Sequence, residues 1–189
     1  MFKLDKAKLI VFRTWLPLAI VTTCLGGLIY LVVQQDLRIG ANDPQIQITE
    51  DVASELASGQ NFQYFIPPTK IDMSKSLANY IMIFDTNGKL VGSSVSLDGK
   101  DPVLPQGAFT STKQNPTNEA RFTWQPKTGV RSAVVLDYYK GQASGFVLVG
   151  RSLREVEIRE DRLELIVFAG WSVTMLLSLL SVFAIRKFK

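Results

Sequence analysis

Histidine is absent from the 189-residue sequence, and cysteine occurs once, as Cys24. Without an imidazole the chain cannot build the usual catalytic triads, and most zinc sites are excluded as well. Because Cys24 is the only cysteine, an intrachain disulfide is excluded, and its position inside a long apolar run excludes thiol catalysis in a water-exposed site. The phosphate-binding loop and the nucleophile elbow are also missing. We therefore expect a chain that is not an enzyme and that carries neither a metal ion nor a cofactor.

Charged residues are missing from two stretches of the chain, 15–33 and 165–185. At about 1.5 Å per residue these runs form helices of about 28 and 31 Å, which match a hydrocarbon core of about 30 Å. The first run is longer than the apolar core of a signal peptide, and no small-x-small cleavage site follows it. The sequence therefore predicts two membrane-spanning helices, at 14–34 and 165–185.

The charges at the ends of these runs predict the orientation in the membrane. Residues 1–13 and 186–189 each carry a net charge of about +3, whereas the segment between the runs carries about −2. Lysine and arginine near membrane ends stay in the cytoplasm. We therefore expect two cytoplasmic tails, 1–13 and 186–189, in the cell (inner) membrane, with residues 35–164 outside. The basic charge belongs to the tails, so no nucleic-acid partner is expected.

The segment 35–151 predicts one extracytoplasmic α+β domain. Residues 45–58 place apolar side chains at helical spacing, with Ile46 and Ile48 on the apolar face, and the helix is expected to end at Gly59. The β-prone runs 79–84 and 89–93 flank Asn87-Gly88, which predicts a hairpin with a type I′ turn. Three further strands are expected at 119–124, 130–139 and 144–150. The segments 60–76 and 97–118 are rich in loop residues and predict irregular connections. The expected architecture is a helix with a roughly five-stranded antiparallel sheet.

A final helix is expected to begin at Ser152. Ser152 and Glu155 fit the capping-box pattern, and residues 153–169 contain neither glycine nor proline. A stalk helix at 152–164 is therefore expected to continue unbroken into the second membrane span. The stalk is either an ordinary solvated helix or a rigid rod that couples the domain to the membrane, and the sequence favours the two interpretations equally.

Binding of a small molecule in a pocket on the sheet is the one chemical function that the sequence does not exclude. Along the strand 130–139, alternation places Arg131, Asp137 and Tyr139 on the same face. Arg131 would clamp a carboxylate and Asp137 would receive an amine, with Trp124 and Tyr139 as apolar walls. The alternative is a cross-strand ion pair surrounded by ordinary core aromatics. The candidate ligand-binding residues are therefore Trp124, Arg131, Asp137 and Tyr139.

The two apolar runs also contain small residues spaced four apart, a pattern that lets membrane helices approach closely. Such pairs suit a homodimer of two-helix subunits; they are Thr22 with Gly26, Thr23 with Gly27, and Thr174 with Ser178. Aromatic residues near the ends of the runs are expected to anchor the helices at the membrane interfaces; they are Trp15, Tyr30 and Trp171.

Two motifs of the outer segment resemble a known family. The run 83–94, which contains Asp85-Thr86-Asn87-Gly88, resembles the hairpin of PAS-like sensor domains of the PDC or Cache type. Residues 129–135 and 145–157 are similar to the sensor region of bacterial transmembrane histidine kinases, in particular Gly150-Arg151-Ser152-Leu153-Arg154-Glu155. The resemblance covers the layout of the whole chain and roughly residues 83–164. It implies a PAS-like domain that binds ligands against its sheet and acts in two-component signal transduction.

The sequence departs from those kinases because it has no histidine to phosphorylate and neither a HAMP linker nor an ATP-binding domain after the second run. The expected function is a membrane-anchored sensor module that passes a signal across the bilayer to a separate histidine kinase or another membrane partner. Two alternatives stay open. One is a membrane-anchored scaffold subunit whose outer domain binds a protein, and the other is a truncated remnant of a sensor kinase.

Overall fold

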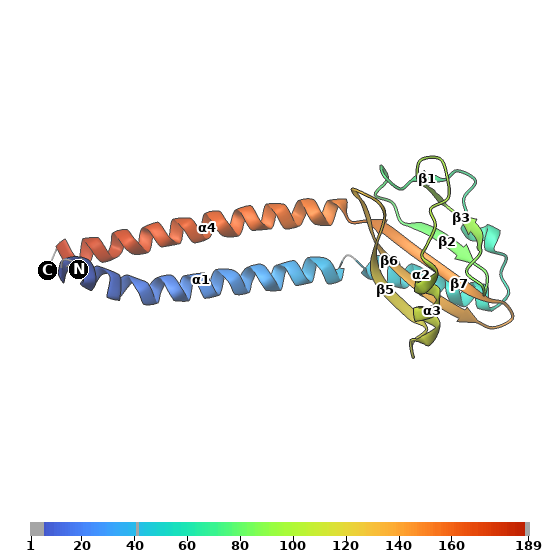
Figure 1. The fold of residues 1–189 in the computed structure, drawn as a ribbon, viewed down its shortest axis with the longest axis horizontal. Coiled ribbons are helices and arrows are strands. Elements are labelled where there is room, and N and C mark those ends of the chain that lie inside the picture. The colour runs from blue at the N-terminus through green and yellow to red at the C-terminus, as the bar shows by residue number, and fades with distance from the viewer. Residues whose placement is uncertain (1–5, 41, 188–189) are drawn as a thin grey trace. The chain divides into compact units, whose positions relative to one another are not determined.

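The computed structural model describes residues 6–40 and 42–187 (Figure 1). The chain divides into two compact units. Met1–Leu37 and Ile158–Lys189 form the first, which we call the helical unit, and Arg38–Glu157 forms the second, which we call the domain.

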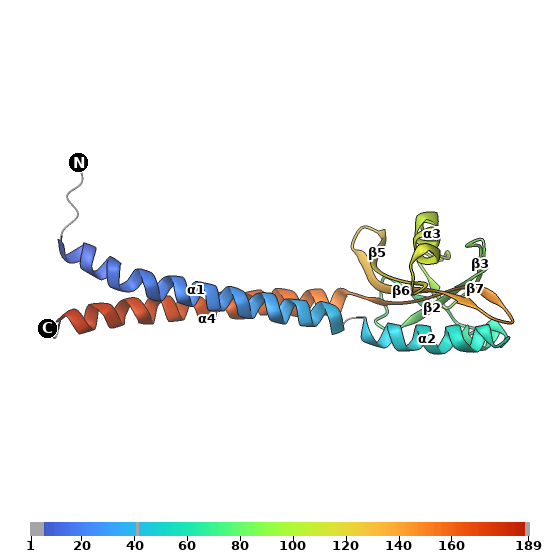
Figure 2. The same ribbon diagram turned by 90° about the horizontal axis from the view of Figure 1, so that it is seen from below.

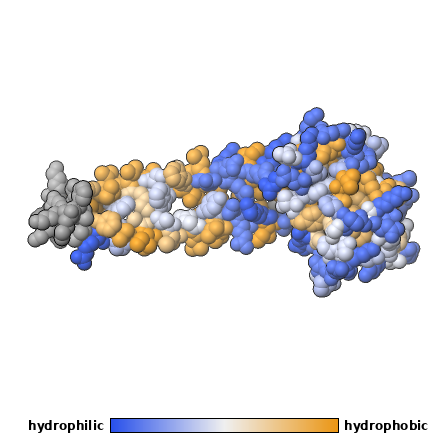
Figure 3. All heavy atoms as spheres, viewed as in Figure 1, coloured by the Kyte–Doolittle hydropathy of each residue, from blue (hydrophilic) through white to orange (hydrophobic). Residues whose placement is uncertain are grey.

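Two long helices form the helical unit. Helix α1 spans Lys6–Gly40 and helix α4 spans Arg154–Lys187, and both are long and apolar enough to cross a membrane. Figure 3 shows apolar side chains over one stretch of the two helices and hydrophilic side chains over another. Six leucines of the two helices are 55% to 62% exposed, an arrangement suited to lipid and not to water; they are Leu25, Leu28, Leu31, Leu176, Leu177 and Leu180. The presence of two helices of membrane-spanning character is confirmed.

One antiparallel sheet organises the domain (Figure 1). Its strands are β2 (Tyr80–Phe84), β3 (Leu90–Ser93), β5 (Glu119–Lys127), β6 (Val130–Lys140) and β7 (Ser144–Ser152), in the order β3-β2-β7-β6-β5. The last strand of the chain, β7, therefore lies in the centre between β2 and β6. Two short parallel strands, β1 (Ile71–Asp72) and β4 (Val95–Ser96), form a separate pair. The expected α+β class and five-stranded antiparallel sheet are confirmed.

Helix α2 (Asp43–Ala57) covers one face of this sheet (Figure 2). Its apolar side chains pack in one core with Ile83, Val147 and Val149 of the central strands; they are Val52, Ala53 and Leu56. The buried face of α2 continues through Gln45 and Thr49. Of the two isoleucines expected on this face, Ile48 is partly buried and packs against this core, whereas Ile46 is partly buried at its margin. The helical period places positions 45, 49, 52, 53 and 56 on the buried face. Gln45 and Thr49 are therefore buried although their side chains are polar.

The other face of the sheet carries a short helix, α3 (Gln106–Gln114), which corrects the expectation that 97–118 is irregular (Figure 2). Phe109 holds α3 in place because its ring packs edge-on against both Phe84 and Phe146, each with centroids 5.0 Å apart. A single aromatic anchor among polar residues gives no helical period to read. The expected irregular connection 60–76 likewise contains a 3-10 helix, η1 (Phe62–Phe65), and strand β1.

The hairpin between β2 and β3 forms, but its turn differs from the expected type I′. Only Gly88 has a positive φ, +80°, and the N–H of Gly88 donates to the carbonyl of Asp85 at 3.0 Å. The Asp85 carboxylate accepts the backbone N–H groups of Asn87 (2.8 Å) and Lys89 (2.9 Å). This is a three-residue loop, a type I turn closed by a left-handed glycine. The aspartate side chain satisfies the loop amides, so Asn87 has no need of a positive φ.

Candidate functional site

The structure separates the four residues that the sequence placed in one pocket. Trp124 pairs across the strands with Ser132, and it is buried in the same core as Val134 and Leu136. Residues directly opposite in a sheet point to the same face. Trp124 therefore lies on the face of α3, whereas Arg131, Asp137 and Tyr139 alternate onto the face of α2. The expectation that Trp124 lines one pocket with the other three is wrong.

Arg131 and Asp137 share a face but not a site. They are six residues apart on β6, which corresponds to about 20 Å along a strand. Arg131 forms an ion pair with Glu157 in the first turn of α4, with 2.5 Å between Nη1 and Oε1. Arg131 and Asp137 therefore form no ion pair with each other, and no single small molecule would contact both. Ligand binding at either residue stays a prediction.

Asp137 lies half-buried among other carboxylates. Burial, together with the negative charges of Glu119 and Glu50, raises the pKa of Asp137 to about 6, although the N–H of Tyr138 opposes this shift. Glu119 is the cross-strand partner of Asp137 and is itself paired with Arg121. Burial also raises the pKa of Tyr139. Among the residues described, no group of three or more acidic or cysteine side chains is arranged to hold a metal ion.

Replacing Asp137 by asparagine should stabilise the protein at neutral pH and not in acid. The pKa of about 6 in the fold lies above the ordinary value of 3.8, so folding takes up a proton between these values. Stability therefore falls as the pH rises from about 4 to about 6. After allowance for solvent screening of the half-exposed carboxyl, D137N should gain about 1 kcal/mol at pH 7.5 and nothing at pH 4.

The measurement is thermal unfolding of the full chain in detergent across this pH range, followed by tryptophan fluorescence. Glu55→Gln, an exposed carboxylate on α2, is the control and should leave the pH profile unchanged. A D137N protein that is less stable than the wild type at pH 7.5 would contradict the assignment of Asp137 as an unfavourable buried charge.

The end of β7 leads directly into α4, with only Leu153 between them. The N–H of Leu153 donates to the carbonyl of Arg131 at 2.9 Å, and the carbonyl of Leu153 accepts the N–H of Glu157 at 2.9 Å. The Ser152 hydroxyl accepts the N–H of Arg154 at 3.3 Å. The helix begins at Arg154 and not at Ser152 as expected, because Ser152 still pairs with Ser132 in the sheet.

Two further arginines tie this junction to the segment that precedes β2. The Arg154 guanidinium donates to the carbonyls of Ser74 (3.4 Å) and Lys75 (3.0 Å). Arg151 donates from Nε to the carbonyl of Leu77 at 3.1 Å. Together with the Arg131–Glu157 pair, these contacts fix the first turn of α4 on the domain. The sequence did not predict these contacts, and the one signal of the junction in the sequence is the motif that begins at Gly150-Arg151.

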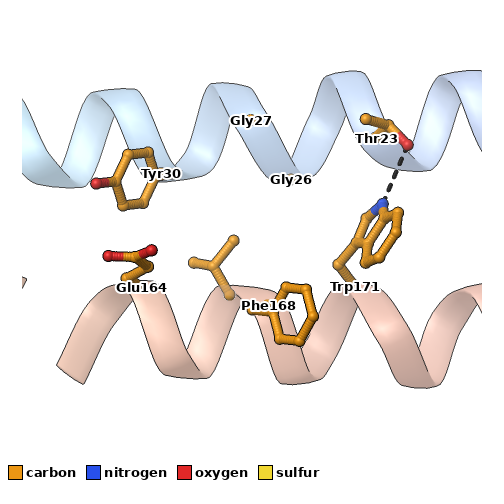
Figure 4. A pocket seen from close by; sticks show the side chains of 8 residues that line it. Thr23, Gly26, Gly27, Tyr30, Glu164, Phe168 and Trp171 are labelled. Atoms are coloured by element: carbon orange, nitrogen blue, oxygen red, sulfur yellow. Dashed lines mark hydrogen bonds between the residues drawn. The ribbon is translucent and has the colours of Figure 1, made fainter. Parts of the chain in front are cut away.

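Within the helical unit, α1 and α4 are joined by hydrogen bonds between side chains. The Trp15 indole donates to Ser178 at 2.9 Å, and the Trp171 indole donates to Thr23 at 3.0 Å (Figure 4). Thr23 and Ser178, two of the small residues expected at helix contacts, therefore join two helices of the same chain. A homodimer stays a prediction.

A groove of about 450 Å³ lies between α1 and α4 in the same region (Figure 4). Four residues from each helix line it; they are Thr23, Gly26, Gly27 and Tyr30 of α1, and Glu164, Val167, Phe168 and Trp171 of α4. Apart from Glu164, two hydroxyl groups and the indole N–H of Trp171, the lining is apolar.

Comparison with known proteins finds no matching family, no similar curated protein and no similar solved structure.

Proposed function

We propose that this chain is a membrane-anchored sensor module that passes a signal from an extracytoplasmic domain to a membrane partner. The observation that carries the proposal is the junction between the sheet and α4. The central strand β7 continues into α4 after one residue, and α4 runs without a break from Arg154 to Lys187. A shift of the central strand therefore has a direct covalent route into a membrane-spanning helix.

The contacts at the junction make such transmission efficient. Arg131, from the neighbouring strand, holds the first turn of α4 through Glu157, and Arg154 holds the segment before β2. A change in the sheet would thus displace the start of α4 as a unit. A ligand can shift such an equilibrium only by its differential affinity for the two states. The signal would be a small molecule or a physical stress that favours one packing of the domain.

The sensor interpretation is also supported by the resemblance of residues 83–94 and 145–157 to PAS-like sensor regions of histidine kinases. The 189 residues contain no histidine, the residue that such kinases phosphorylate. We therefore assign the output to a separate histidine kinase in the same membrane, contacted through α1 and α4. In this proposal both tails are cytoplasmic and the domain lies outside the bilayer, as the charges at the membrane ends predict.

The proposal predicts that crosslinking of the tagged full-length chain in its native membranes, followed by mass spectrometry, recovers a separate histidine kinase. A matched chain, in which residues 15–33 and 165–185 are replaced by leucine-alanine helices of the same length, should keep the domain and lose the kinase. Recovery of only the chain itself, or of unrelated envelope proteins, would refute a separate kinase. It would favour the scaffold or the truncated-kinase alternative.

A further inference from the structure

On the α1 side of the groove, no side chain covers the backbone at Gly27. A Cβ atom added at Gly27 would meet no atom within 4 Å, whereas at Gly26 it would lie 3.8 Å from the Trp171 ring. Phe168 and Trp171 stack with ring centroids 6.0 Å apart and form the wall contributed by α4 (Figure 4). The groove is therefore open above Gly27 and lined by apolar atoms along its length.

The carboxylate of Glu164 lies at one end of the groove. In sequence, this is the end nearer to the domain, residues 38–157. Glu164 directly precedes the apolar run 165–185, and across the groove it faces Tyr30, near the end of the run 15–33 (Figure 4). No hydrogen bond or ion pair joins Glu164 to any residue that the structure describes. Seven residues, or about 10 Å of helix, separate Glu164 from Trp171. The groove therefore has a carboxylate at one end and an apolar channel along the rest of its length.

We propose that this groove binds a phospholipid of the domain-proximal leaflet whose headgroup carries a primary ammonium. The acyl chain lies over Gly27 against Phe168 and Trp171, and the ammonium pairs with Glu164 beside the Tyr30 hydroxyl. The ethanolamine headgroup has this chemistry. An ammonium donates several N–H bonds to a carboxylate, whereas a choline headgroup donates none, and an anionic glycerol headgroup is repelled.

A lipid suits the groove better than a third helix. A helix with its side chains is about 10–12 Å across and needs a broad face, whereas a flexible chain follows a narrow channel. Water cannot fill an apolar groove at membrane depth, and lipid chains surround the helices from all sides. Charge complementarity at Glu164 then selects among the lipids present. The inference rests on the proposal that α1 and α4 cross the bilayer.

The test uses the full-length chain in vesicles of phosphatidylethanolamine, phosphatidylcholine and phosphatidylglycerol in equal amounts, extracted mildly and weighed by native mass spectrometry. We expect phosphatidylethanolamine to be retained about five- to tenfold over phosphatidylcholine. Glu164→Gln should abolish this preference, and Gly27→Leu should displace the lipid by filling the groove. The matched controls are Asp161→Asn on the stalk and Gly170→Leu, whose Cβ also meets open space but outside the groove; both should behave as wild type.

Equal retention of the two zwitterionic lipids by the wild-type chain would overturn the proposal. The occupant is identified by placing benzoylphenylalanine at Phe168: a photo-adduct with lipid supports a lipid groove, and an adduct with a second copy or another protein overturns it. Failure of the membrane-spanning proposal is seen separately, because the chain would then be released from membranes by alkaline carbonate.

Discussion

Replacing Gly150 by alanine should destabilise the domain by about 1–3 kcal/mol, the usual cost of overpacking a core. Gly150 lies in the central strand β7 and pairs with Tyr80 of β2. An added Cβ would fall 2.3–2.7 Å from three atoms of the Tyr80 side chain. Tyr80 is only 2% exposed, so its ring has no solvent to move into. The alanine would displace either the ring or the strand that leads into α4.

The expected loss is measured by thermal or urea unfolding of the full chain in detergent. A double-mutant cycle with Tyr80→Leu isolates the cause, because G150A should cost far less once the ring is gone. Gly107→Ala in α3 is the matched control: its Cβ meets nothing within 4 Å, and it should be neutral or slightly stabilising. Equal losses with and without the Tyr80 ring would show that the cost arises in the backbone and not from this contact.

Local patterns were sufficient to predict most of the secondary structure. Alternation and Asn87-Gly88 located the hairpin, and the two charge-free runs located α1 and α4, because each of these signals depends on neighbours in the sequence. Helix α3 was not predicted because Phe109 is its one large apolar side chain, and the rings that Phe109 packs against belong to β2 and β7, which are distant in sequence. The turn type was wrong because the Asp85 side chain, and not a positive φ at Asn87, completes the turn.

The candidate site was less predictable because it depends on which strands pair and in which register. Alternation along one strand correctly placed Arg131 and Asp137 on a common face. It gave no information on Trp124, whose face follows from its pairing with Ser132 on β6. The partner of Arg131 is Glu157, in the next helix, and the partners of Arg154 are backbone carbonyls in the segment before β2. Carbonyl acceptors leave no signature in side-chain composition, so these contacts required the structure.

Gln45→Met should stabilise the domain by about 1–3 kcal/mol, because a buried amide without a hydrogen-bond partner costs about that much free energy. Gln45 is 0% exposed, and neither its Oε1 nor its Nε2 has a hydrogen-bond partner. It lies on the buried face of α2, in line with Thr49, Val52 and Leu56. Methionine has nearly the same volume and shape but no polar atom, so it should fill the site without creating a cavity.

The control for this prediction lies two residues further along the same helix. Gln47 is exposed, and Gln47→Met should change stability by less than about 0.5 kcal/mol. If Q45M instead lowers the unfolding temperature, the amide must have a partner in solution, and the cost assigned to it is wrong. If Q45M stabilises as expected, the wild-type chain keeps a glutamine that weakens the packing of α2 on the sheet. Because α2 begins three residues after the end of α1, a weakly held α2 would be, under the proposed function, a second connection between the domain and a helix apolar enough to cross a membrane.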